Sequence, residues 1–256
     1  MALLQVEKLT KVFGGLRAVS NVEMKIEPGE LVGLIGPNGA GKTTIFNLLT
    51  GVIPPSEGQI VFNQKSIVGL KPYNVTDIGI ARTFQNIRLF KTLSVLDNVR
   101  IAYHHRVKYN LFESMLFRFG RFRTEEAKLT EEALNFLDIF GLKNLSGESA
   151  QNLPYGMQRR LEIARAMATG PSLLLLDEPA AGMNPQETKE LMELIDFIRK
   201  KFKLTILLIE HDMSLVMGIC ERIYVLDYGQ LIAEGTPAEI KANPRVIEAY
   251  LGEEAS

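Results

Sequence analysis

The sequence is poor in several features that mark whole classes of protein. It contains no tryptophan and a single cysteine, Cys220, so no disulfide can form within the chain. It has no CxxC pair and no cysteine–histidine cluster, which argues against a structural zinc site. Cys220 lies in an apolar stretch, which favours a buried structural thiol over a reactive one.

Long hydrophobic runs are also missing. The longest, at 172–176 and 204–209, are far below the roughly 20 residues that span a bilayer, and their length suits buried parallel strands. The N-terminus has no basic segment followed by an apolar run, so we expect no secretory signal and expect any membrane role to come through partners. The formal charge of -1 gives no overall attraction to nucleic acid or anionic lipid.

The composition is that of one large globular α/β domain. Of the 256 residues, 46% are hydrophobic and 23% are charged. Alternating apolar and polar positions predict antiparallel strands at 3–13, 22–30 and 58–66. Apolar runs predict buried strands at Leu31–Gly36, Ser172–Asp177 and Leu204–Glu210. Residues 95–169 have a mostly helical pattern, which includes an amphipathic helix over Glu125–Phe140.

The segment Gly36–Thr43 matches the phosphate-loop pattern GxxxxGK[ST] in full, follows a predicted strand and opens a helix at Thr44. Glycines let main-chain N–H groups converge on phosphate oxygens, and a helix N-terminus adds a favourable dipole. Lys42 can reach the β- and γ-phosphates, and the Thr43 hydroxyl can coordinate Mg²⁺. By itself the motif leaves kinases, GTPases and ATPases open. The residues expected to bind the nucleotide here are Gly36, Pro37, Asn38, Gly39, Ala40, Gly41, Lys42, Thr43 and Thr44.

Two adjacent acids, Asp177 and Glu178, end an apolar strand. Asp177 can hold the Mg²⁺ shell, and Glu178 can orient water or take its proton beside the γ-phosphate. A base at this point favours hydrolysis over phosphoryl transfer to a metabolite. The alternative is a solvated strand end, where acids are common.

Four further features resemble those of ABC ATPases. Leu153–Arg160 resembles the signature region, usually LSGGQ followed by QR; Gln85 resembles the Q-loop glutamine, His211 the switch histidine, and Phe13 the aromatic that stacks on adenine. Their order along the chain is that of the family, and the resemblance covers almost the whole chain.

The resemblance implies a RecA-like P-loop core with an antiparallel β subdomain, at 1–85 and 166–256, and a helical signature subdomain at 86–165. It also implies a head-to-tail dimer that holds ATP between the phosphate loop of one subunit and the signature helix of the other. Glu178, His211 and Gln85 are then catalytic, and Thr43, Gln85 and Asp177 hold Mg²⁺. The residues expected to face the partner's ATP are Pro154, Tyr155, Gly156, Met157 and Gln158.

Within the family the sequence is most similar to the LivG-type subunits of branched-chain amino acid importers. The stretches that carry this likeness are Arg82–Phe90, Arg160–Arg165, Asp177–Pro185 and Ile209–Met213, together with an insertion near 103–123. The likeness implies a cytoplasmic ATPase, peripheral on the inner face of the membrane. It implies two membrane-spanning permeases and, indirectly, an extracytoplasmic solute-binding protein as partners, and no nucleic acid.

Three positions depart from the family pattern: Pro154 replaces a serine, Met157 a glutamine, and Asn184 stands where aspartate is frequent. Pro154 suits the start of a helix but offers phosphate no hydroxyl. A homodimer would repeat this weakened signature at both sites. We therefore expect a heterodimer whose partner carries a more standard signature, with a homodimer as the alternative.

Several features have a plainer interpretation. His211 could be a strand-end histidine bonded to a carbonyl, and Phe13 could belong to the core. The basic and aromatic stretch 103–123 could contact nucleic acid, lipid headgroups or membrane subunits, although its spacing favours a helical hairpin with solvated arginines. Two rival functions are an ABC ATPase acting on DNA or ribosomes and a nucleotide-gated binding module without useful hydrolysis. Glu178 argues against the second rival.

Overall fold

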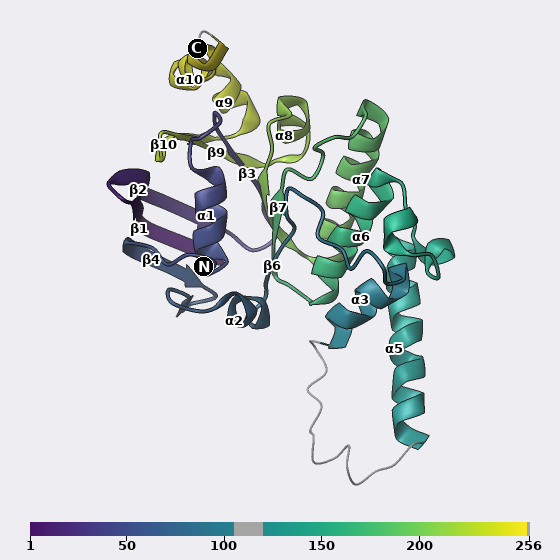
Figure 1. The fold of residues 1–256 in the computed structure, drawn as a ribbon. Helices are drawn as coiled ribbons and strands as arrows, with labels where there is room; N and C mark the ends of the chain where they lie inside the picture. Colours follow the sequence, from purple (N-terminus) through teal and green to yellow (C-terminus); the bar gives the residue numbers. More distant parts are fainter. Residues whose placement is uncertain (105–119, 255–256) are drawn as a thin grey trace. The chain divides into compact units, whose positions relative to one another are not determined.

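The computed structural model describes residues 1–104 and 120–254. They form two compact units, Met1–Gln85 with Ser172–Ser256, and Asn86–Pro171 (Figure 1). Within the described residues no helix is long and apolar enough to cross a membrane.

A six-stranded sheet forms the centre of the first unit, in the order β10-β9-β3-β8-β7-β6. Neighbouring strands from β9 to β6 are parallel, and β10 is antiparallel to β9. The strands β3, β7 and β8 are buried at every residue, which explains their continuous apolar sequences. The bounds are β3 (Leu31–Ile35), β6 (Ile80–Arg82), β7 (Leu173–Asp177), β8 (Thr205–Ile209), β9 (Arg222–Asp227) and β10 (Gln230–Gly235).

The helices of this unit begin at local capping signals. Asn184 and Glu187 form a capping box at the start of α7, and Thr236 with Glu239 forms another at α9. The Asp212 carboxylate accepts the backbone N–H groups of Ser214 and Leu215 at the start of α8. The bounds are α1 (Lys42–Leu49), α2 (Pro72–Asp77), α7 (Pro185–Phe202), α8 (Met213–Ile219), α9 (Pro237–Ala242) and α10 (Pro244–Glu254).

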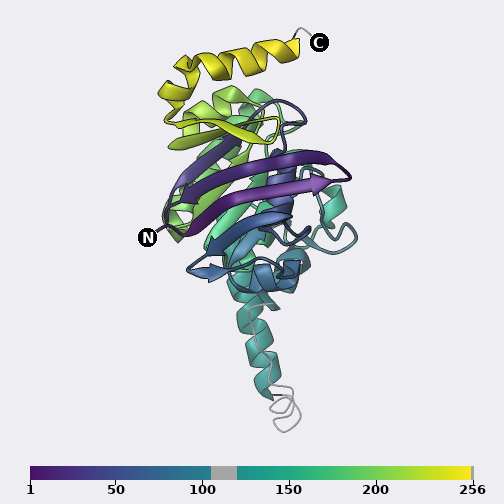
Figure 2. The same ribbon diagram turned by 90° about the vertical axis from the view of Figure 1, so that its left-hand side faces the viewer.

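A second, antiparallel sheet has the order β2-β1-β4-β5 and faces the viewer in Figure 2. One hydrophobic cluster joins it to α1 and the six-stranded sheet, with Leu4 and Ile26 from the antiparallel sheet, Phe46 from α1, and Leu175 and Leu207 from the parallel strands. Burial of this continuous core fixes the two sheets on opposite sides of α1. The bounds are β1 (Leu4–Phe13), β2 (Leu16–Ile26), β4 (Glu57–Phe62) and β5 (Lys65–Ser66).

Two predicted strands needed correction. The strand predicted at 22–30 runs over Leu16–Ile26, because Gly14 and Gly15 turn the chain back directly after β1, with φ of 50° and 97°. The strand predicted at 58–66 is divided into β4 and β5 by a turn at 63–64, where both residues have positive φ. Strands β6, β9 and β10 were not predicted from the sequence.

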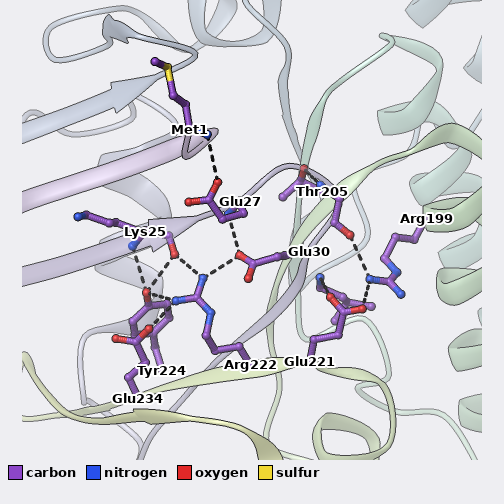
Figure 3. A network of polar contacts seen from close by, with 12 residues as sticks. Met1, Lys25, Glu27, Glu30, Arg199, Thr205, Glu221, Arg222, Tyr224 and Glu234 are labelled. Carbon is purple, nitrogen blue, oxygen red and sulfur yellow. Dashed lines mark hydrogen bonds and ion pairs between the residues drawn. The ribbon is translucent and has the colours of Figure 1, made fainter.

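A polar network joins the two sheets through Arg222 at the start of β9 (Figure 3). Its guanidinium pairs with Glu30 and Glu234 and donates a hydrogen bond to the Lys25 carbonyl. Burial lowers the pKa of Arg222, but the hydrogen bonds to Glu30 and Glu234 outweigh it and raise the pKa above its ordinary value. The arginine therefore remains charged and ties β9 to the end of β2.

The second unit consists of α3 (Val95–His104), α5 (Gly120–Ile139) and α6 (Tyr155–Ala168), with short 3-10 turns at Lys143–Leu145 and Ala150–Asn152. Tyr103 of α3 meets Phe136 of α5 edge to face, with ring centroids 5.7 Å apart. Helix α6 continues past the expected subdomain boundary at residue 165, and the compact unit ends at Pro171. Residues 105–119 of the hairpin expected at 103–123 lie outside the described residues.

Candidate functional site

The phosphate-loop segment Gly36–Gly41 joins β3 to α1 and needs its glycines. Gly36 has φ of 152°, and a Cβ there would lie 2.0 Å from the Leu226 carbonyl oxygen. Gly41 has φ of 103°, and a Cβ there would lie 2.5 Å from the Ala18 carbonyl oxygen. Any side chain at either position would push the loop away from β9 or β2.

The loop is held closely by its own lysine and by the β9–β10 turn. The Lys42 Nζ donates to the carbonyl oxygens of Gly36 at 2.6 Å and Pro37 at 2.9 Å. The Gly229 N–H donates to the Ala40 carbonyl at 2.9 Å. These contacts make the curved backbone rigid, with a buried ammonium group at its centre.

The features of this segment suit a bound phosphate group. Helix α1 begins at Lys42, and no side chain in the described part of the molecule caps its N-terminus. Its first N–H groups are therefore of the kind that bind anions, and the helix dipole adds to the attraction. Space is open around the Cα of Gly39, which has φ of 76°, and the Thr43 side chain is exposed.

Asp177 ends β7 in a buried ion pair. Its Oδ2 lies 2.7 Å from Arg82 Nη2, and the two side chains are only 4% and 8% exposed. Arg82 Nη1 also donates to Asn47 Oδ1 of α1 at 2.7 Å. The guanidinium packs against the rings of Phe46 and Phe84, at 5.4 and 5.3 Å from their centroids. Arg82 therefore fixes the direction of the Asp177 carboxylate.

Glu178 lies at the centre of a cluster that joins the three predicted catalytic residues, Glu178, His211 and Gln85. Its Oε1 lies 2.7 Å from His211 Nε2, and its Oε2 accepts a hydrogen bond from Gln85 Nε2 at 2.7 Å. Glu178 has φ of 47°, a left-handed conformation that costs a non-glycine residue about 1–3 kcal/mol. Its N–H bonds to the Ile209 carbonyl at 2.9 Å, which holds this turn against the end of β8.

The arrangement suits a magnesium nucleotide. Mg²⁺ prefers oxygen ligands and is usually bound by one or two protein oxygens together with phosphates and water. Thr43, Gln85 and Asp177 offer such oxygens. No group of three His, Cys, Asp or Glu side chains within residues 1–104 and 120–254 is arranged to hold a metal ion alone. The residues therefore fit a metal whose remaining ligands come from phosphate.

Phe13 ends β1 and has 45% of its surface exposed, so the core interpretation of this residue is wrong. The Lys11 Nζ lies 5.0 Å from the Phe13 ring centroid. An exposed ring beside a cation is suited to contact a planar ligand.

The signature residues lie at the start of α6, in the second unit. Pro154 precedes the first helical residue, Tyr155, and is the N-cap residue, so it does lie at the start of a helix. Gln158 Nε2 donates to the Leu153 carbonyl at 2.8 Å, which steadies the chain before the helix. Arg159 is fully buried and pairs with Glu162 at 2.7 Å.

Sequence reasoning gave no role to two residues that contact this site, Arg82 at Asp177 and Glu210 at the backbone N–H of His211. Arg82 was part of a stretch that carried the family likeness, and it received no role. Glu210 was included at the end of a predicted strand, also without a role. Glu210 left a signal, because it is a charged residue immediately beside a strand that otherwise reads as buried. Arg82 left none, because the three residues of β6 are too few to show a strand in the sequence.

The P-loop core, the antiparallel sheet and the helical unit together define a nucleotide-binding cassette fold. A family model described as ABC transporter matches residues 19–181, and one described as branched-chain amino acid ATP-binding cassette transporter matches residues 230–256. The chain belongs to the ABC transporter family. This confirms the predicted resemblance and fold class.

Relatives and solved structures agree with this assignment. The high-affinity branched-chain amino acid transport ATP-binding protein LivG of Escherichia coli K12 is 50% identical over 251 residues, 98% of each chain. The corresponding protein BraF of Pseudomonas aeruginosa is 48% identical over 98% of each chain. The ADP conformation of MJ1267, an ATP-binding cassette of an ABC transporter, has a TM-score of 0.84 and 30% identity, covering 99% of this chain and 100% of that one.

Proposed function

We propose that this chain binds ATP with Mg²⁺, hydrolyses it, and so powers a membrane importer of branched-chain amino acids. The observation that carries the hydrolytic part is the Glu178 carboxylate held between His211 and Gln85, each at 2.7 Å. The transported solute is proposed from the 50% identity to LivG over almost the whole chain.

In this proposal the protein's residues have distinct tasks. Backbone N–H groups of the phosphate loop and the Lys42 ammonium bind the phosphates, because both are donors aimed at anionic oxygens. Thr43 and Asp177 hold Mg²⁺, which supplies positive charge against the developing negative charge on the phosphates. Glu178 orients the attacking water or accepts its proton, and His211 and Gln85 keep that carboxylate in place. Phe13 stacks on the base.

Comparison of wild-type ATPase activity with that of Glu178→Gln tests hydrolysis. The amide keeps the size of the side chain but cannot accept the proton, so we expect ATP binding to persist and turnover to fall at least about 100-fold. Glu193→Gln, an exposed acid on α7, is the matched control and should keep wild-type turnover. Equal turnover in both variants would contradict the role of Glu178. ATP binding without wild-type turnover, even with membrane subunits, would favour a nucleotide-gated binding module.

We further propose that the working unit is a heterodimer of two cassettes on the cytoplasmic face of two permeases, supplied by an extracytoplasmic binding protein. Pro154 and Met157 support this, because neither side chain replaces the hydrogen-bonding group of a standard signature. Loss of one hydrogen bond to a charged group costs about 1.5–3 kcal/mol. The test is dimerisation of the purified chain with ATP. Dimerisation and turnover of the chain alone as fast as with any second cassette would exclude the heterodimer.

A further inference from the structure

Glu210 is a buried carboxylate for which the proposed mechanism has no role. It follows the last residue of β8 and is only 3% exposed. Burial raises the pKa of Glu210, while hydrogen bonds from the backbone N–H groups of Ala180, His211 and Asp212 oppose that rise. An acid that accepts several main-chain donors in the interior is unlike a solvated strand end.

The two oxygens of Glu210 reach two different loops. Oε1 accepts the Ala180 N–H at 2.8 Å, in the turn that follows β7. Oε2 accepts the His211 N–H at 3.1 Å, at the start of the loop that follows β8. The same turn contains Glu178. A hydrogen bond from the Ala181 N–H to the Glu178 carbonyl at 3.2 Å stabilises this turn. One side chain thus joins the backbones on both sides of the Glu178–His211 contact.

Within residues 1–104 and 120–254, the His211 side chain has one polar contact, the one to Glu178. The His211 side chain is 49% exposed, whereas that of Glu178 is 10% exposed. The direction of such an exposed imidazole depends on the position of its own backbone. The backbone of Glu178 is in a left-handed conformation, which persists only when its surroundings determine it.

We propose that Glu210 is a positioning residue that holds the turn after β7 and the loop after β8 together, so that His211 Nε2 and the Glu178 carboxylate face each other. The proposal rests on the proposed function. Glutamate suits this task because both of its oxygens are acceptors. A glutamine would present an NH₂ group to one of the two backbone donors, and that contact would open.

The test combines kinetics with a readout of the contact itself, on the full chain. The chain has three histidines, so ring-labelled histidine gives three NMR signals, and the signal missing from His211→Ala is that of His211. Its shift in Glu178→Ala, which removes both carboxylate oxygens, defines the broken contact. Glu239→Gln is the matched control, because Glu239 also accepts a backbone N–H, that of Thr236 at 2.7 Å, in an exposed capping box.

We expect Glu210→Gln to move the His211 signal toward the position seen in Glu178→Ala and to lower kcat by about 100-fold, the cost of a misplacement of about 1 Å. The dissociation constant for ATP should stay within about twofold of the wild-type value, because the phosphate loop is unchanged. Glu239→Gln should leave the His211 signal and kcat at their wild-type values.

A folded Glu210→Gln protein with the wild-type His211 signal and wild-type kcat would overturn the proposal. If that variant does not fold, Glu210→Asp replaces it. The shorter acid keeps both acceptor oxygens but cannot reach both loops, so we expect the same shift of the His211 signal. An unshifted His211 signal in Glu210→Asp would also overturn the proposal. A wild-type protein without turnover would contradict the proposed function, and the His211 signal would still decide the role of Glu210.

Discussion

Removal of the Arg82 side chain should destabilise the fold strongly, because it leaves a buried charge without its partner. The Asp177 and Arg82 side chains are 4% and 8% exposed, so solvent screens their 2.7 Å contact very little. Breaking a buried ion pair by removing one partner costs about 3–5 kcal/mol. Arg82→Ala also removes the hydrogen bond to Asn47 and the packing against Phe46 and Phe84. We therefore expect a loss of about 3–5 kcal/mol in the free energy of unfolding.

Urea unfolding of the full chain measures this loss. Lys200→Ala is the control, because its ion pair with Asp196 is exposed and is worth about 0.3–0.5 kcal/mol. The double variant Arg82→Met with Asp177→Asn removes both charges, so it should be more stable than Arg82→Ala. A loss below about 1 kcal/mol in Arg82→Ala, with no coupling between the two sites, would refute the reasoning.

Three other measurements address separate parts of the molecule. Lys42→Ala should abolish tight binding of a fluorescent ATP analogue, because the ammonium that faces the phosphates is lost; unchanged affinity would contradict the phosphate-loop assignment. Asp212→Ala should cost about 1 kcal/mol of stability as a lost helix cap. The hydrogen bond from the Ser214 side chain lowers the pKa of Asp212 from 3.8. The stability that the Asp212 carboxylate contributes is therefore present at neutral pH and is lost as the pH falls through the lowered pKa. A stability difference between wild type and Asp212→Ala that persists to pH 2 would exclude the carboxylate as its cause. Burial raises the pKa of Cys220 to about 12, so the thiol should resist iodoacetamide at pH 8 until the protein unfolds; rapid labelling of the native chain would contradict that burial.

The sequence predicted the parts of the fold whose signals are local. Uninterrupted apolar runs marked β3, β7 and β8 because parallel strands buried on both faces carry few polar residues. The extent of β2 was missed because its start depends on a two-glycine turn rather than on alternation. The three residues of β6 are too few to show a period, and their strand identity comes from pairing with β7.

The sequence names the residues of the candidate site but not the contacts that hold them. Asp177 and Glu178 were predicted from their place at the end of an apolar strand, and His211 was predicted from the family resemblance. The partner of Asp177 is 95 residues away in sequence, at Arg82, and no periodicity links the two. Glu210 shows the same limit, because its bond to Ala180 joins residues 30 positions apart. Such contacts appear only when the strands have been placed side by side.

The register of the parallel strands explains why these residues meet. Asp177 is paired with Ile209 across β7 and β8, and Leu34 is paired with Ile209 across β3 and β8. Residues just beyond the three strand ends therefore lie along one edge of the sheet, in the order phosphate loop, His211 loop and Glu178 turn. Because side chains alternate between faces, a slip of one residue between β7 and β8 would turn Asp177 away and separate Glu178 from His211. The strand register does not by itself hold the turn after β7 and the loop after β8 together. The hydrogen bonds of Glu210 to Ala180 and His211 join these two segments.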